Sequence, residues 1–176
     1  YPCSIFIVGM PRSGTTLVES VISLNGEVQD LGETNIFEKA YQESIKNEQL
    51  SLTDLYFKKI KELGINSCIT SNKWLYNYLY AGIIANQISN SKIIYCLRNP
   101  LDNILSIYRA NFTKVTFSSN IKDIAELYVH HYELMKLYAE TYRNNLLIYN
   151  YDELVTNPTV QIRKIIDYSS IIMGLV

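Results

Sequence analysis

The sequence predicts a three-layer α/β fold in which a central parallel sheet is flanked by helices. Short apolar runs without polar alternation, typical of strands buried on both faces, recur four times along the chain. Segments with helical spacing of apolar residues lie between them. Strand and helix therefore alternate, an order that favours a parallel sheet with right-handed crossovers and functional loops at the carboxyl ends of the strands.

The elements follow in order along the chain. The expected strands are residues 4–8, 67–70, 92–97 and 146–150. The apolar residues with helical spacing between them are Leu17, Val21, Ile22 and Leu24, then Ile83, Ile84 and Ile88, then Ile104, Leu105 and Ile107. Residues 121–143 are expected to form one long helix, and Pro158 is suited to the first turn of a last one.

Composition limits the classes of protein that fit. The 176 residues suffice for one domain with a core but are few for two, and 48% hydrophobic with 19% charged residues is typical of globular chains. A net charge of -1 gives no overall basic field for nucleic acid, so any anion site must be local. No apolar stretch is long enough for a membrane span. Three scattered cysteines, Cys3, Cys68 and Cys96, fit reduced thiols better than a disulfide framework.

The first expected strand runs into a glycine-rich turn, IFIVGMPRSGTTL, that suits an anion. Gly9 and Gly14 bracket the turn, where glycine lets backbone N–H groups approach a phosphate and the helix dipole adds positive potential. A nucleotide-hydrolysing loop has lysine directly after the second glycine, but Thr15 stands there. Arg12 suits an anion with several oxygens, and Thr15 and Thr16 add hydroxyl donors. The alternative is a plain turn with an exposed arginine.

A second motif, CLRNPLDNILSIYR, follows the third expected strand. Asn99 suits a helix cap, Pro100 the first turn and Asp102 the capping-box position, so a helix is expected to begin here. Arg98 lies at the strand's carboxyl end and Ser106 two turns inside the helix. Both reach one phosphate group if the helix folds back beside the strand end. Alternatively, Ser106 is an ordinary helix residue and Arg98 forms a surface ion pair.

Together the two motifs resemble the sulfotransferases that use 3′-phosphoadenosine 5′-phosphosulfate (PAPS), over about residues 4–168. GMPRSGTTL is similar to the loop that holds the 5′-phosphosulfate, and LRNPLDNILSIY to the element that holds the 3′-phosphate. Arginine in PRSGTTL matches the tyrosylprotein-sulfotransferase-like branch and bacterial sulfotransferases that often follow tetratricopeptide repeats. The resemblance implies a P-loop NTPase-like fold and assigns these donor-site residues: Pro11, Arg12, Ser13, Gly14, Thr15, Thr16, Arg98 and Ser106.

The resemblance also implies catalytic residues. Arg12 would grip the transferring sulfuryl group, and Glu33 in LGETNIF matches the glutamate that serves as base in the tyrosylprotein branch. A carboxylate there accepts the acceptor hydroxyl's proton if it stays ionised and close. Lys73 in SNKWLYN resembles a lysine that offsets charge on the bridging oxygen, although Leu75 stands where the branch has proline. Asn77 matches the following family position. The alternatives to these catalytic roles are that Glu33 is an ordinary surface glutamate and that Lys73 is an ordinary surface lysine.

Two histidines and the absence of metal motifs complete the survey. His130 and His131 are adjacent in a periodic helix, so they point about 100° apart and cannot both enter one site. Because they are far in sequence from every loop motif, we expect structural roles, although cytosolic sulfotransferases use a histidine base. No cluster of His, Cys and carboxylates has metal spacing, and the resemblance implies no metal.

The rival classes are an anion-binding module without catalysis and, with less support, a nucleotide kinase. The tail SSIIMGLV departs from the family's continuation, so we expect residues 1–176 to be a single sulfotransferase domain truncated at both ends, without the last donor-site loop. The kinase interpretation is disfavoured because this sequence lacks the loop lysine and an evident aspartate for Mg²⁺. The implied acceptor bears a hydroxyl, on a peptide tyrosine, a carbohydrate or a small molecule. The bacterial resemblance favours a cytoplasmic protein, with possible upstream tetratricopeptide repeats.

Overall fold

The computed structural model describes residues 1–47, 49–110 and 116–169. Its strands are β1 (Cys3–Gly9), β2 (Val28–Asp30), β3 (Ile69–Asn72), β4 (Ser91–Leu97) and β5 (Leu146–Asn150). Its α-helices are α1 (Thr15–Ile22), α2 (Ile36–Lys46), α3 (Leu52–Glu62), α4 (Ala81–Gln87), α5 (Pro100–Ala110), α6 (Ile121–Thr141), α7 (Tyr151–Thr156) and α8 (Pro158–Ser169). Two short 3₁₀ helices are η1 (Leu75–Tyr80) and η2 (Thr116–Ser119).

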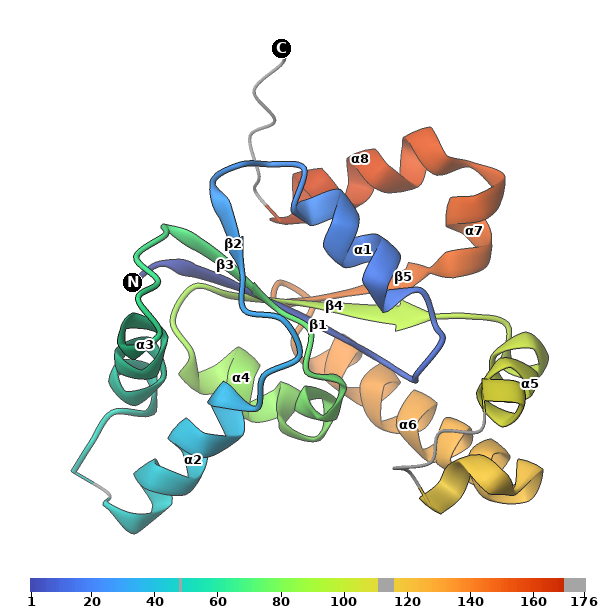
Figure 1. Ribbon diagram of the computed structural model, residues 1–176, viewed down its shortest axis with the longest axis horizontal. Coiled ribbons are helices and arrows are strands. Elements are labelled where there is room, and N and C mark those ends of the chain that lie inside the picture. The colour runs from blue at the N-terminus through green and yellow to red at the C-terminus, as the bar shows by residue number, and fades with distance from the viewer. Residues whose placement is uncertain (48, 111–115, 170–176) are drawn as a thin grey trace.

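The five strands form one parallel sheet in the order β2-β3-β1-β4-β5 (Figure 1). β1 lies at the centre, paired with β3 on one side and with β4 on the other. The carboxyl ends of these three strands therefore lie side by side at one edge of the sheet. In a parallel α/β sheet, that edge is where ligands bind.

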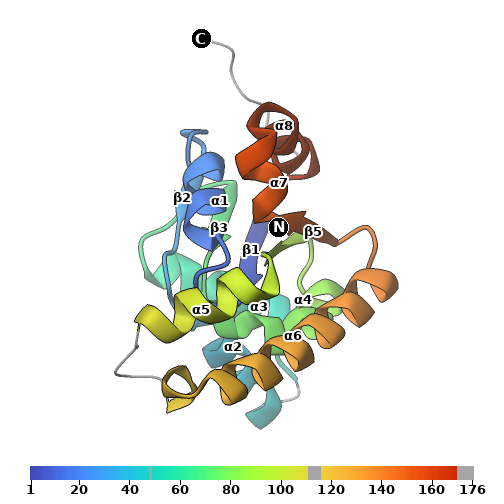
Figure 2. The same cartoon turned by 90° about the vertical axis from the view of Figure 1, so that its right-hand side faces the viewer.

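Helices cover both faces of the sheet, which explains why the central strands are apolar throughout. α2, α3, α4 and α6 pack on one face, and α1 and α8 on the other (Figures 1 and 2). Alternate residues of β1 face the two layers: Phe6 and Val8 belong to the first core, and Ile5 and Ile7 to the second. The three-layer α/β fold predicted from the sequence is confirmed.

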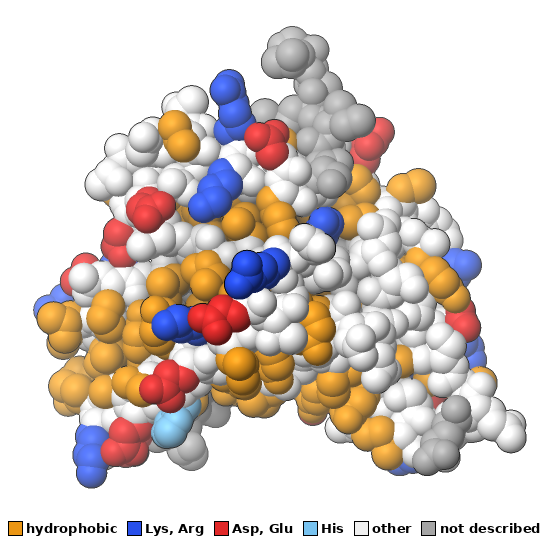
Figure 3. Space-filling view, turned by 180° about the vertical axis from the view of Figure 1, so that it is seen from behind, with side chains coloured by type: hydrophobic (Ala, Val, Ile, Leu, Met, Phe, Trp, Pro, Cys, Tyr) orange, Lys and Arg blue, Asp and Glu red, His pale blue; other side chains and the backbone are white. Residues whose placement is uncertain are grey.

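The long helix α6 lies along the lower layer and has two kinds of face. It buries Ile124, Tyr128, His131 and Met135. Its exposed large apolar residues are Ile121, Val129, Tyr132 and Leu137. Seen from behind in Figure 3, hydrophobic side chains gather on the lower half of the molecule. The buried face brings His131 toward the sheet.

Several element boundaries differ from the sequence prediction; the long helix expected at 121–143, for example, spans Ile121–Thr141. The strand expected at 67–70 spans Ile69–Asn72, where each residue pairs with one of Cys3–Phe6 in β1, so the polar end of the segment extends the strand. The edge strand β2 was not predicted, since three residues with two exposed side chains carry no apolar run. Within the described residues, no helix combines the length and apolarity needed to cross a membrane. Residues 170–176, on which the truncated-tail argument depends, lie outside them.

Candidate active site

The loop from Gly9 to Thr16, called the phosphate loop below, joins β1 to α1 at the central strand's carboxyl end. Gly14 has a φ of 94°, and a Cβ there would meet the Tyr151 ring at 2.4 Å. Arg12 also has a positive φ, of 66°. Such a conformation is uncommon outside glycine and clusters at ligand sites. The chain thus holds the loop in a shape that aims the first amides of α1 at the cleft.

The second motif packs directly on this loop. Arg98, the residue after β4, donates from Nη1 to the Arg12 carbonyl oxygen at 3.0 Å, and its guanidinium lies 5.0 Å from the Tyr151 ring centroid. Arg12 Nε donates to Ser106 Oγ at 3.3 Å. Asn103 Nδ2 donates to the Pro11 carbonyl at 2.9 Å. The two arginines, 86 positions apart in sequence, therefore face one site.

The start of α5 is fixed as its sequence predicts. Asn99 Oδ1 accepts hydrogen bonds from the backbone N–H groups of Leu101 at 3.0 Å and Asp102 at 3.3 Å, which caps the helix. The Asn99 N–H in turn donates to Asp152 Oδ2 at 2.6 Å. The helix that carries Ser106 is thereby tied to the segment after β5.

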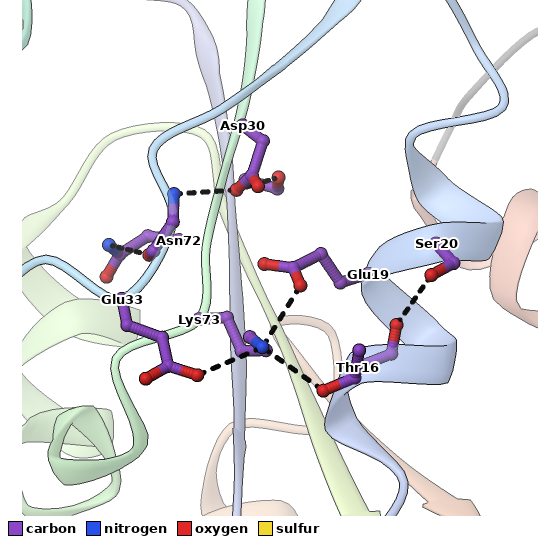
Figure 4. A network of polar contacts seen from close by, with 9 residues as sticks. Thr16, Glu19, Ser20, Asp30, Glu33, Asn72 and Lys73 are labelled. Carbon is purple, nitrogen blue, oxygen red and sulfur yellow. Dashed lines mark hydrogen bonds and ion pairs between the residues drawn. The ribbon is translucent and has the colours of Figure 1, made fainter.

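Lys73, the residue after β3, lies at the centre of a polar cluster on the other side of the phosphate loop (Figure 4). Its Nζ lies 3.1 Å from Glu19 Oε2, 3.1 Å from Glu33 Oε1 and 3.2 Å from Thr16 Oγ1. Burial disfavours the charged lysine, but the hydrogen bonds to Glu33 and Glu19 outweigh it, so the pKa of Lys73 is raised. Burial raises the pKa of Glu19, and the bond to Lys73 partly offsets this.

The loop that carries Glu33 is docked on the end of β3. Buried Asn72 donates from Nδ2 to the Gly32 carbonyl at 3.2 Å and to the Thr34 carbonyl at 3.0 Å. Asn77 Nδ2 donates to Asn72 Oδ1 at 2.6 Å and so orients that amide. The Lys73 N–H donates to the Gly32 carbonyl at 3.1 Å. Glu33 therefore stands on a backbone fixed by at least three hydrogen bonds from one strand end.

A cleft of about 810 Å³ lies beside these groups, although Lys73, Glu19 and Ser106 are not among its lining residues. One part is lined by the phosphate loop, Arg98 and Tyr151, and Glu33 lies along the same cleft. Apart from Leu17, the remaining lining residues, called the aromatic wall below, are Trp74, Leu75, Tyr76, Tyr78, Leu127 and His131. The volume of the cleft is within the range of small-molecule sites.

His131 belongs to this wall, although its neighbour His130 is exposed. The His131 ring is only 2% exposed and lies 4.1 Å, centroid to centroid, from Tyr78. Its Nδ1 is 3.4 Å from the Tyr95 hydroxyl. Burial lowers the pKa of His131 to about 4, so the imidazole is neutral at physiological pH.

The donor groups of the cleft suit an anion. Ser13 Oγ and Arg98 Nε are buried and have no hydrogen-bond partner among the described residues. Buried polar atoms usually have partners, so these two donors are available to an anion bound at the phosphate loop. The described residues contain no group of three or more His, Cys, Asp or Glu that could hold a metal ion. The site presents an arginine fork, hydroxyls and helix amides.

A family model described as "Sulfotransferase domain" matches residues 2–172. The chain belongs to the sulfotransferase family. It is thus a member of a family of transferase enzymes, as its motifs indicated. A protein of Aquifex aeolicus described as uncharacterized is 27% identical over 189 residues, covering 93% of this chain and 25% of that protein. The chain therefore spans about a quarter of the length of this curated relative.

Solved structures share the fold. A sulfotransferase from Alicyclobacillus acidocaldarius has a TM-score of 0.66 at 15% identity, covering 100% of this chain and 84% of its own. A mouse sulfotransferase complexed with PAP has a TM-score of 0.58 at 16% identity, and the match covers 95% of this chain and 58% of the mouse chain. Shikimate kinase from Bacteroides thetaiotaomicron has a TM-score of 0.53 at 12% sequence identity, and the match covers 94% of each chain. At these identities the likeness shows the P-loop-type fold alone, which sulfotransferases and kinases share.

The structure of this sulfotransferase-family chain brings the residues singled out in its sequence to one edge of the sheet. Arg12, Arg98 and Ser106 contact one another, and Lys73 contacts Glu33. The alternatives of a surface lysine and of a surface ion pair for Arg98 do not match this geometry. His131 lines the cleft although it is far in sequence from the loop motifs, because α6 crosses beneath the cleft. The structural role expected for both histidines stays a prediction.

Sequence reasoning missed three residues of the site. Glu19 lies one helical turn after Thr16 and so faces the same side of α1, but a glutamate in a helix gives no signal by itself. Tyr151 reaches the phosphate loop from the end of β5, a contact between segments distant in sequence. Asn72 has a readable signal: a polar residue at the end of a buried strand.

Proposed function

We propose that this chain transfers a sulfuryl group from PAPS to a hydroxyl group of an acceptor. The family supports sulfuryl transfer in general, and the choice of donor rests on the cleft. A donor with phosphate at both ends of a nucleoside needs two anion sites, and two adjoining sets of donors are present. The phosphate loop after β1 supplies one, and Arg98 with Ser106 after β4 supplies cations and hydroxyls for the other.

The observation that carries the proposal is the row formed by the ends of β3, β1 and β4. Neighbouring parallel strands end there in Lys73, the phosphate loop and Arg98 respectively. Acceptor oxygen, sulfur and 5′-phosphate must lie along one line for in-line transfer. A row of cationic and amide donors on both sides of that line stabilises the charge that develops on the transferring oxygens.

The predicted residues other than Pro11 have the following roles in this scheme. The amides of Ser13–Thr16 bind the 5′-phosphate, Arg98 and Ser106 bind the 3′-phosphate, and Arg12 binds the oxygens of the sulfuryl group. Glu33 accepts the acceptor's proton as its oxygen attacks sulfur. The bond between sulfur and the bridging oxygen breaks, and Lys73 offsets the charge left on that oxygen. The products are a sulfate ester and adenosine 3′,5′-bisphosphate.

The aromatic wall favours one kind of acceptor among the three considered. Trp74 and Tyr76 lie 5.4 Å apart, centroid to centroid, beside the loop that carries Glu33. Lys73 lies next to this wall but is engaged by two carboxylates. A peptide rich in acidic residues would find no free cation on the wall's six residues, whereas an uncharged ring with a hydroxyl would stack on them.

The donor assignment is tested by calorimetry with adenosine 3′,5′-bisphosphate, compared with ATP and Mg²⁺. Arg98→Ala should weaken bisphosphate binding by about tenfold or more, because charge-assisted hydrogen bonds are lost. Arg109→Ala, an exposed arginine in the last turn of α5, is the matched control and should bind like the unmodified chain. Equal loss in both variants would contradict the assigned 3′-phosphate site.

The base is tested by sulfuryl transfer from labelled PAPS to phenols, sugars and tyrosine peptides. Glu33→Gln should lower turnover by roughly 10²- to 10⁴-fold and leave bisphosphate affinity nearly unchanged. Glu27→Gln, an exposed glutamate, controls for the lost charge. Full turnover in Glu33→Gln would remove Glu33 from the mechanism.

The same measurements separate the rival functions. Bisphosphate binding with no transfer to any acceptor would indicate an anion-binding module. Tighter binding of ATP with Mg²⁺ would indicate a kinase, which the threonine after Gly14 already disfavours.

A further inference from the structure

Lys73 is held between two carboxylates that differ in exposure to solvent. The side chain of Lys73 is 9% exposed and that of Glu19 15%, whereas that of Glu33 is 65% exposed. Both carboxylates lie 3.1 Å from Nζ. Removing a buried partner leaves an uncompensated charge, while an exposed carboxylate exchanges its partner for water at little cost. The Glu19 contact is therefore the lasting one.

The hydrogen-bonding capacity of Lys73 is fully used. An ammonium group has three N–H donors and no acceptor. Thr16, Glu19 and Glu33 accept three bonds from it (Figure 4). A further oxygen can be bound only if one of these contacts is released, and the exposed Glu33 is the one free to leave.

We propose that Glu19 is a positioning residue that keeps Lys73 in place while Glu33 exchanges its contact with Lys73 for the acceptor hydroxyl. This inference rests on the proposed sulfuryl transfer. When the donor enters, its bridging oxygen takes the third N–H of Lys73, and Glu33 is freed as a base. Glu33 is thus available for proton transfer only when the donor is bound. When an acceptor binds without the donor, Glu33 remains paired with Lys73.

The surrounding charges agree with this division. The groups that act on Glu19 are Lys73, Glu33 and Asp30. Asp30 is engaged elsewhere, because its Oδ1 accepts from the Gly32 N–H at 2.7 Å and from Ser71 Oγ at 3.2 Å. Glu19 Oε1 is buried without a partner among the described residues. Lys73 is the cation that holds this buried carboxylate.

The test compares Glu19→Gln and Glu19→Asp, with Glu27→Gln as an exposed control that also removes one charge. The first readout is the titration of the Lys73 ammonium, followed by NMR of lysine-labelled protein without nucleotide. Glu19→Gln should shift this titration to lower pH, Glu19→Asp should restore most of the shift, and Glu27→Gln should leave it unchanged. An unchanged titration in Glu19→Gln would overturn the assignment.

The second readout is transfer kinetics in the same variants. Glu19→Gln should lower kcat by about tenfold or more and move the alkaline limb of the kcat profile to lower pH. The KM for the donor should change less than threefold, since Lys73 acts mainly on the leaving oxygen. Glu19→Asp should recover much of kcat and provides a folded comparison if Glu19→Gln is unstable.

The two readouts separate failure of this inference from failure of the proposed function. Normal kcat in a Glu19→Gln variant whose Lys73 titration has shifted would overturn the positioning role alone. Absence of transfer by the unmodified chain would overturn the function and the role with it, while the titration would still report the ion pair.

Discussion

At Gly14 the backbone turns from the phosphate loop into α1 in a conformation that a side chain tolerates poorly. Its φ is 94°, and the Tyr151 ring occupies the space where a Cβ would point. The same ring lies against Arg98. A change at Gly14 therefore reaches Arg98 through Tyr151.

Gly14→Ala should destabilise the fold by roughly 1–3 kcal/mol, from backbone strain and displacement of Tyr151, and should weaken bisphosphate binding. Urea unfolding and calorimetry measure the two effects. Gly26→Ala is the matched control, because its Cβ meets no atom within 4 Å. Gly26→Ala should leave stability unchanged or raise it slightly, because alanine reduces the conformational freedom of the unfolded chain. Similar losses at both glycines would argue against a special shape at Gly14.

Among the elements, α6 carries a group whose protonation opposes folding. Burial holds the pKa of His131 at about 4, below its ordinary value of about 6.5. The neutral ring is therefore favoured in the folded state. The contribution of neutral His131 to the free energy of unfolding is fully present above about pH 6.5. It is lost as the pH falls toward 4.

His131→Phe, which keeps a ring beside Tyr78, should remove a pH dependence worth about 3 kcal/mol between pH 6.5 and 4. Unfolding free energies from urea titrations at several pH values measure it. His130→Phe removes an exposed imidazole from the same helix and should retain the acid loss. Parallel curves for the unmodified chain and His131→Phe would show that His131 is solvated.

Over the whole molecule, the central strand joins the two cores, so its side chains should govern stability. Phe6→Ala should cost about 3–5 kcal/mol, because Phe6 is fully buried and its ring lies 6.0 Å from Phe37 and 5.5 Å from Tyr56. Leu24→Ala, 73% exposed, should change stability by less than about 0.5 kcal/mol. Denaturant unfolding tests both, and equal effects would contradict the central place of β1.

Much of this architecture was predictable because buried parallel strands and helix caps leave local signals. The runs before Gly9 and Arg98 and the cap at Asn99 located the two motifs within a residue or two. Contacts between distant segments were not predictable: nothing local relates Tyr151 to Gly14, or Glu19 to Lys73. The place of His131 depended on how α6 crosses the sheet, which its own periodicity does not reveal.

The position of β1 between β3 and β4 has a consequence for how such a protein could diversify. The phosphate loop and Arg98 follow β1 and β4, whereas four of the six residues of the aromatic wall lie in η1 or directly before it, in the segment that follows β3. Exchange of that one short stretch would therefore reshape one wall of the cleft while the turns after β1 and β4 stay unchanged.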